Sequence, residues 1–215
     1  MKYLFTIITL CFLSSCQDKK VVQLPEIIHS DTNEVLDVSP AYLFYDETKP
    51  DSLELNRKNL ISTTNWLINV DKRLTLEQAI PSIIFLQEKK RNAKMHKNEA
   101  AKNYYTCNNT RIKNLGFIEF TDVVFQLDQT AENYLKDKAS DHVILNFSQG
   151  LNNLDEVILD IDKSALDAIE VLSKETQLLL NFDKTMSFQE YITIKSKLSA
   201  IKNPSITINN NEFIY

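Results

Sequence analysis

Two aspartates hold positions from which a carboxylate pair could carry out acid and base chemistry. Asp71 and Asp183 each end an apolar segment typical of a β-strand, TNWLINV in the first half of the chain and TQLLLNF in the second. Positioned carboxyl groups of this kind serve as general acid and base in hydrolysis of glycans and peptides. Aspartates in such turns also accept hydrogen bonds from the turn's own amides. The sequence favours this structural role and leaves hydrolysis as the alternative.

No other pattern indicates a catalytic or metal centre. The three histidines lie far apart in the sequence, and none belongs to a cluster with metal-ligand spacing. Ser52, Ser164 and Ser187 are expected to cap helices, because no glycine-flanked elbow surrounds them as it surrounds a hydrolase nucleophile. Phosphate-binding loops need several neighbouring glycines, and the chain has only Gly116 and Gly150. We expect neither a metal nor a cofactor.

A basic stretch is the best candidate for contact with a partner. Lys89, Lys90 and Arg91 are consecutive in a highly charged segment, and Tyr104 and Tyr105 follow in a segment expected to be a loop. Clustered positive charge attracts anionic polymers and lipids. The same charges suit the solvated outer surface of a helix. Partner binding by these five residues is therefore a hypothesis.

Bulk composition describes a chain that can bury a core of its own. Its 215 residues are 43% hydrophobic and 25% charged, as in ordinary globular proteins. The formal net charge of -5 argues against nucleic acid as a partner. Cys11 and Cys16 lie in the N-terminal segment, so Cys107 is left alone and no disulfide framework is expected. A lone thiol is either buried or free to pair between chains, and we expect burial.

The first sixteen residues, MKYLFTIITLCFLSSC, indicate where the protein resides. A lysine precedes an apolar run over 3–13, and two serines and a cysteine close the segment. The run is shorter than the about 20 residues of a membrane span and has the build of an export signal. Ser14-Ser15-Cys16 resembles the lipobox of bacterial lipoproteins.

That resemblance implies cleavage after residue 15 and attachment of lipid to the sulfur of Cys16. The expected location is the bacterial cell envelope, at the outer membrane facing the periplasm, with residues 16–39 as a tether. A plain secretory signal, which would leave Cys16 as a thiol, is the alternative.

Beyond the tether the sequence alternates predicted strands and helices. Strands are predicted over 41–45, 64–70, 142–147, 157–161 and 176–182, with one or two more over 115–127 and two short ones over 205–208 and 212–215. Helices are predicted over 52–61, from 75 towards 91, over 164–175, and from 187 to a point before Pro204. Thr75 to Gln78 and Ser187 to Glu190 fit capping boxes. Pro81 is expected to kink the second helix or shift its start.

The chain also resembles itself. With an offset of 112, the segment 64–87 aligns without gaps on 176–199, and both capping boxes coincide. Downstream, 112–114 matches 201–203 if the first copy carries an insertion over 88–111. We therefore predict an α/β (α+β) fold of two similar strand-helix-strand-helix-strand layers, each with helices on one face of a mixed sheet, sharing one core. The units are expected at 40–128 and 141–215, with 129–140 as connector.

The second unit resembles the periplasmic domain of the ExbD/TolR family of biopolymer-transport proteins. The features that carry this resemblance are an apolar strand ending in Asp183-Lys184, then Ser187 and Phe188 opening an amphipathic helix, and a last strand. The resemblance implies a fold that can form a homodimer and can meet peptidoglycan or envelope proteins. Family members that couple to ion flow have a transmembrane helix with an essential aspartate, which this chain lacks, so no motor role is implied.

Together these features predict a membrane-anchored, non-enzymatic envelope lipoprotein that binds a protein partner or cell-wall polymer as an accessory to biopolymer transport. The alternatives are a lipid-anchored hydrolase that uses Asp71 and Asp183, and a binding lipoprotein exposed on the cell surface.

Overall fold

The computed structural model describes residues 20–93, 98–136, 142–150, 176–201, 204 and 206–215. The strand predicted over 157–161 and the helix predicted over 164–175 lie outside these residues. Within them the chain forms the elements β1 (Glu26–Ile27), β2 (Val38–Tyr45), η2 (Pro50–Ser52), β3 (Leu53–Asn56), β4 (Asn65–Val70), α2 (Leu76–Arg91), β5 (Asn103–Asn109), β6 (Asn114–Glu119), β7 (Val124–Gln126), α3 (Ala131–Leu135), β8 (His142–Phe147), β9 (Thr176–Phe182), α5 (Phe188–Ser199) and β10 (Ile206–Ile214).

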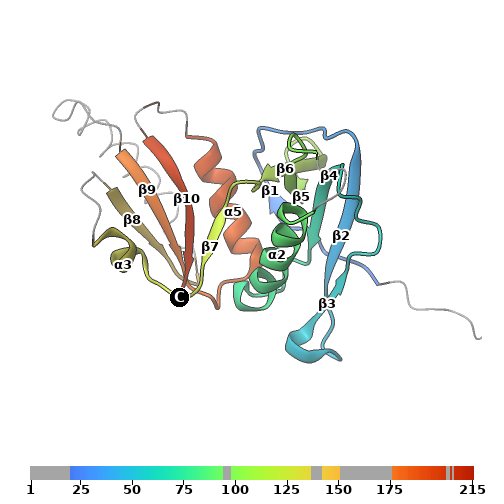
Figure 1. Ribbon diagram of the computed structural model, residues 1–215, viewed down its shortest axis with the longest axis horizontal. Helices are drawn as coiled ribbons and strands as arrows, with labels where there is room; N and C mark the ends of the chain where they lie inside the picture. Colours follow the sequence, from blue (N-terminus) through green and yellow to red (C-terminus); the bar gives the residue numbers. More distant parts are fainter. Residues whose placement is uncertain (1–19, 94–97, 137–141, 151–175, 202–203, 205) are drawn as a thin grey trace, which may run out of the picture.

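Two sheets lie on either side of a pair of helices, which confirms the predicted mixed α and β fold class. The first sheet has the order β1-β5-β4-β2-β3, with β6 added to β5, and the second has the order β7-β10-β9-β8. Figure 1 shows α2 and α5 between the sheets, while α3 lies on the far side of the second sheet. Each helix thus covers the inner face of its own sheet.

The same strand order occurs in both halves. In the first sheet β4 pairs in parallel with β2 and β5, and in the second sheet β9 pairs in parallel with β8 and β10. The registers also correspond, because Leu43 lies opposite Val70 and Phe147 lies opposite Phe182. The helix that follows each central strand starts at a capping box, formed by Thr75 in α2 and by Ser187 in α5. Both capping boxes are as predicted.

The two turns that precede these helices bind each other reciprocally. The amide of Leu76 donates to the carbonyl of Met186 at 2.9 Å, and the amide of Phe188 donates to the carbonyl of Leu74 at 2.7 Å. These two bonds are related by the offset of 112 found in the sequence. A second pair of backbone hydrogen bonds is related in the same way. The amide of Glu77 donates to the Lys184 carbonyl at 2.9 Å, and the amide of Gln189 donates to the Lys72 carbonyl at 3.2 Å. The halves therefore meet around a pseudo-two-fold axis.

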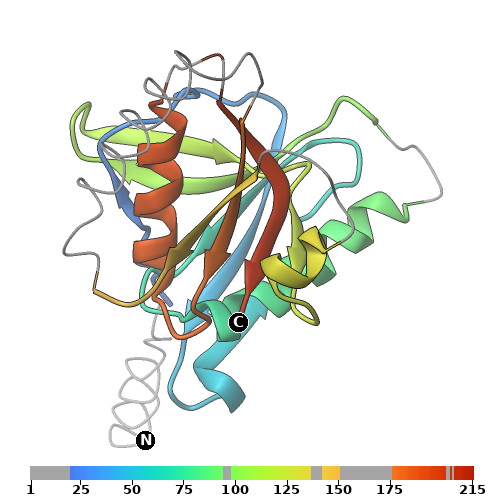
Figure 2. The ribbon, with the colours of Figure 1, turned by 90° about the vertical axis from the view of Figure 1, so that its left-hand side faces the viewer.

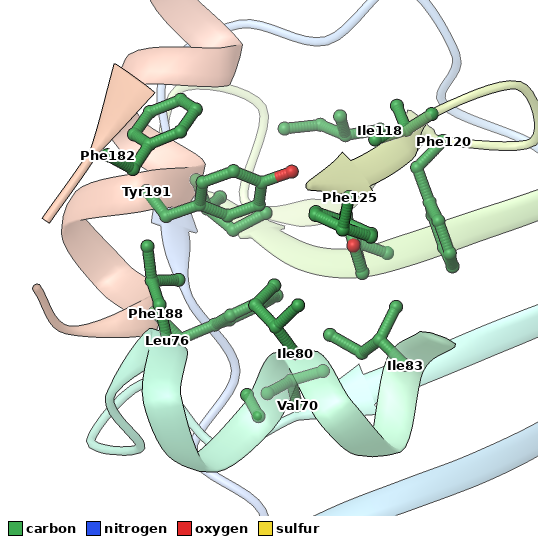
Figure 3. Close-up of a cluster of buried hydrophobic side chains, with 14 of the residues drawn as sticks. Val70, Leu76, Ile80, Ile83, Ile118, Phe120, Phe125, Phe182, Phe188 and Tyr191 are labelled. Atoms are coloured by element: carbon green, nitrogen blue, oxygen red, sulfur yellow. The ribbon is translucent and has the colours of Figure 1, made fainter. Parts of the chain in front are cut away.

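One hydrophobic core joins the halves, as predicted. It contains side chains of β4 and α2 together with side chains of β9 and α5. Figure 3 shows Leu76, Ile80 and Ile83 of α2 facing Phe188 and Tyr191 of α5, with further residues from both sheets around them. A second, smaller cluster places Ala131 of α3 against Leu179 and Phe213 on the outer face of the second sheet.

Several local predictions were wrong. Residues 52–61 form no helix, because Asp51 and Ser52 take positive φ and the chain turns back as β3 along β2. The segment 104–110, predicted to be a loop, belongs to strand β5 except for its last residue. Asparagines are uncommon in strands, so the residues of this segment carry no clear strand signal. The final residues form one bulged strand, β10, in place of two short ones. Helix α2 begins at Leu76 and continues through Pro81, so the proline does not shift its start.

The predicted unit boundaries also need correction. Residues 20–39 are no free tether, since β1 pairs with β5 and other residues of the segment bind the body of the protein. Strand β7 lies within the predicted first unit but pairs with β10 in the second sheet. The supposed insertion over 88–111 contains the last turn of α2 and all of β5, which corresponds in topology to β10. The predicted match of 112–114 with 201–203 lies partly outside the described residues.

Candidate functional site

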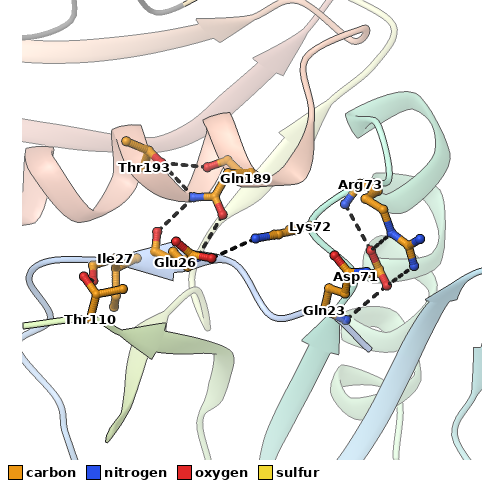
Figure 4. Close-up of polar contacts among 9 residues, drawn as sticks. All are labelled: Gln23, Glu26, Ile27, Asp71, Lys72, Arg73, Thr110, Gln189 and Thr193. Atoms are coloured by element: carbon orange, nitrogen blue, oxygen red, sulfur yellow. Dashed lines mark hydrogen bonds and ion pairs between the residues drawn. The ribbon is translucent and has the colours of Figure 1, made fainter. Parts of the chain in front are cut away.

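Asp71 is fully buried and its carboxylate is saturated by donors. It accepts hydrogen bonds from the amides of Gln23 and Arg73, both at 3.1 Å, and two from the Arg73 guanidinium at 2.8 and 2.9 Å. Figure 4 shows these donors converging on the carboxylate. Burial opposes ionisation of Asp71, but the bonds from Arg73 and the two amides outweigh it and lower its pKa. The group is a structural anion.

Asp183 plays the corresponding role in the second half. Its Oδ1 accepts from the amide and the hydroxyl of Thr185, at 2.8 and 2.7 Å. Bonds from the Thr185 hydroxyl and amide lower the pKa of Asp183, and burial opposes them. Both predicted aspartates thus bind turn amides, which is the structural role that the sequence favours.

The residues of the predicted partner-binding patch do not share one surface. Tyr104 and Tyr105 are buried, and the Tyr105 ring stacks on Phe120 with centroids 3.9 Å apart. Lys89 and Arg91 are exposed at the end of α2, but Lys90 between them is 7% exposed. The tyrosines therefore cannot offer stacking faces to a sugar. Lys90 is buried, although its segment was expected to be a solvated helix surface.

The Lys90 ammonium lies inside the protein with only neutral acceptors. Its Nζ donates to the Lys102 carbonyl at 2.8 Å and to Oδ1 of Asn103 at 3.0 Å, and it lies 5.2 Å from the centre of the Trp66 ring. No carboxylate of the described residues lies within ion-pair distance of it. An ammonium has three hydrogens to donate, and these two bonds use two of them. Burial lowers the pKa of Lys90 to about 8.

A pocket of about 190 Å³ opens beside Lys90. Arg91 lines it as well and donates to the Val123 carbonyl at 3.2 Å. The lining is mixed in charge and rich in hydroxyl and amide groups: Ser62, Lys90, Arg91, Asn98, Glu99, Ala101, Asn103, Thr121 and Asp122. Such a lining suits a small polar group that carries a carboxylate for Lys90. We call this cavity the Lys90 pocket.

A second pocket of about 240 Å³ lies where the two halves meet. Its lining includes Ile118 of β6, Lys195 and Leu198 of α5, Ile208 of β10 and the segment 30–32. Lys195 forms an ion pair with Glu212, which is 1% exposed.

The hydroxyl of Tyr191 donates to the other oxygen of Glu212 at 2.7 Å. Both oxygens of this buried carboxylate are therefore satisfied, so we assign the group to the core. Sequence patterns could not find it, because Glu212 follows three asparagines and gives no motif.

The remaining chemistry-bearing residues are inert or isolated. Cys107 is buried as expected, and burial raises the pKa of its thiol. Among the residues that the structure describes, no group of three His, Cys, Asp or Glu side chains could hold a metal ion. Over the same residues, no helix has the length and apolar character needed to cross a bilayer.

Comparison with known proteins gives no relative: no family model, no curated protein and no solved structure matches this chain. Function must therefore be inferred from the sequence and the structure.

Proposed function

We propose that the protein is a lipid-anchored, non-enzymatic binding protein of the bacterial envelope, held by Cys16 at the outer membrane and facing the periplasm. It binds a carboxylate of an envelope peptide, as carried by protein partners and by the stem peptides of peptidoglycan. The observation that carries this proposal is the Lys90 ammonium, buried without a carboxylate and adjoining a pocket. An uncompensated buried cation gains most from an anionic ligand, because the local dielectric is low.

The two aspartates support the non-enzymatic part of the proposal. Asp71 is buried and accepts four hydrogen bonds, and one oxygen of Asp183 accepts two from Thr185, which favours a structural role for both carboxylates. The family resemblance adds an accessory position beside biopolymer transport. The strand-helix-strand order found in each half supports it.

The test is co-sedimentation of the lipidated protein, in detergent, with purified peptidoglycan sacculi. Removing the charge by Lys90→Met should lower the bound fraction about tenfold, because a charged hydrogen bond contributes about 1.5–3 kcal/mol. Lys89→Met is the matched control, since Lys89 is the exposed neighbour on the same helix. A photo-crosslinker at Asn98, which lines the pocket, identifies a protein partner if the wall does not bind. Equal binding or crosslinking by both methionine variants, at equal thermal stability, would refute the proposal.

A further inference from the structure

The N-terminal segment fixes one end of the protein close to its lipid anchor. Lys20 forms ion pairs with Asp46, at 2.8 Å, and with Glu54. Asp46 directly follows β2, and Glu54 belongs to β3, which returns along β2. The first described residue of the chain is thus bound at the carboxyl end of strand β2.

Hydrogen bonds to the backbone continue this attachment. The amide of Gln23 donates to Asp71, and the Gln23 carbonyl accepts from the amide of Lys72 at 2.8 Å. The Pro25 carbonyl then accepts from Asn108, also at 2.8 Å, where β1 joins the sheet.

At the start of β1, Lys72 and Gln189 bind Glu26 from the two halves of the molecule, as Figure 4 shows. The segment therefore crosses the carboxyl ends of β2 and β4 before it enters the fold.

Chain length limits how far this end can be from the lipid. Four peptide steps separate Cys16 from Lys20 and span at most about 14 Å. If the exposed ion pairs of Lys20 open, seven steps separate Cys16 from Gln23, and the limit is about 25 Å. No long tether lifts the protein off the bilayer.

Resting on the lipid anchor of the proposed function, we infer that the carboxyl-end edge of the first sheet is the membrane-facing surface. This edge comprises Lys20, Asp46, the η2 turn and Arg73, and the bound partner is the phospholipid headgroup layer around the anchor. Figures 1 and 2 show the η2 turn projecting from this end of the molecule. Each cation of this edge is paired with a carboxylate: Lys20 with Asp46 and Glu54, Lys49 with Glu54, and Arg73 with Asp71.

The opposite end of the molecule then faces away from the membrane. Helix α2 has 16 residues and spans about 24 Å from the membrane-facing end to the amino ends of the strands. Lys90 lies in its last turn, and its acceptors Lys102 and Asn103 precede or begin β5. The Lys90 pocket is thereby presented to the periplasm. This placement is what a binding site for a wall or protein partner requires.

Two fluorescently labelled variants test this orientation in vesicles that contain lipids with a nitroxide quencher on the headgroup. Lys49→Cys places the label at the η2 turn, and Leu36→Cys places it beyond the amino end of β2, at a residue that is 72% exposed. The eight residues of β2 separate the two sites by about 23 Å or more. Cys107 is buried and will not take the label. Quenching should be several-fold stronger at position 49 than at position 36.

A linker variant supplies the matched control. About twelve Gly and Ser residues inserted between Asp18 and Lys19 add about 20 Å of flexible reach, and should reduce the difference in quenching between the two labels. Mass spectrometry of the same samples reports the lipid on Cys16. Equal quenching at both positions in lipid-bearing protein would refute the orientation alone. Protein without lipid on Cys16 would refute the anchor, and with it the proposed function.

Discussion

Replacing Lys195 by methionine should destabilise the protein strongly, and more than changing the carboxylate that it binds. Glu212 is 1% exposed, and the Lys195 ammonium provides its counter-charge. In Lys195→Met the Glu212 carboxyl group stays buried without its counter-charge and keeps the hydrogen bond from the Tyr191 hydroxyl. Breaking a buried pair from one side costs about 3–5 kcal/mol of unfolding free energy.

Substituting Glu212 in place of Lys195 should cost less unfolding free energy, because the Lys195 ammonium can reach solvent. Its side chain is 12% exposed and lines the pocket between the halves, so the ammonium can reach solvent when its partner is lost. Glu212→Gln also keeps an acceptor for Tyr191. We expect a loss of about 1–2 kcal/mol, as for one hydrogen bond.

Urea unfolding measures both losses. With a slope of about 2–3 kcal/mol per molar urea, Lys195→Met should lower the midpoint by about 1–2 M and Glu212→Gln by less than about 1 M. The double variant should recover part of the loss, with a coupling energy of about 1–3 kcal/mol. The reasoning is refuted if Lys195→Met costs less than about 1 kcal/mol, or no more than Glu212→Gln.

Three further predictions concern single groups. The Asp71 pKa is lowered in the fold. Its contribution to stability is therefore present above the unfolded pKa of about 3.9 and is lost as the pH falls further. The difference in unfolding free energy between wild type and Asp71→Asn should shrink below about pH 4. The pKa of Lys90 is lowered to about 8, so ligand binding should weaken as the pH rises through 8. Urea titrations at each pH should show the stability of the wild type, relative to Lys90→Met, increasing from pH 8 towards pH 10. A Cβ on Gly116 would lie 2.6 Å from the Ser30 hydroxyl oxygen, so Gly116→Ala should cost about 1–3 kcal/mol, whereas unchanged stability would show that the segment 30–32 yields easily.

The regular elements were predictable because their signals are local. Strands such as β4 and β9 are mostly apolar, and both α2 and α5 begin at side chains that cap their own amides. The internal repeat predicted the equivalence of the halves, which the reciprocal bonds of Leu76 and Phe188 support. The strand and helix signals depend on neighbours within a few positions.

The failures came from contacts between distant residues. Strand β5 has asparagine or threonine at four of its seven positions, three of them buried, and its place between β4 and β6 is what makes it a strand. Residues 20–39 have no periodic pattern, yet they are held by Asp71, Gln189 and Asn108. The basic stretch was a useful guide to Lys90, but its burial depends on Trp66 and Asn103, which no spacing rule connects to it.

The reciprocal bonds between the two pre-helix turns bear on how the chain reaches its final state. Leu76 and Glu77 come more than a hundred residues before their acceptors Met186 and Lys184 in the chain, so these bonds form only when the second half reaches the first. Until then the earlier half has an open apolar flank where α5 will lie, and β7 has no strand to join. Docking of the second half on the first is therefore the step that completes both halves at once. A nick in the connector should leave two fragments that stay associated, and neither should persist folded alone.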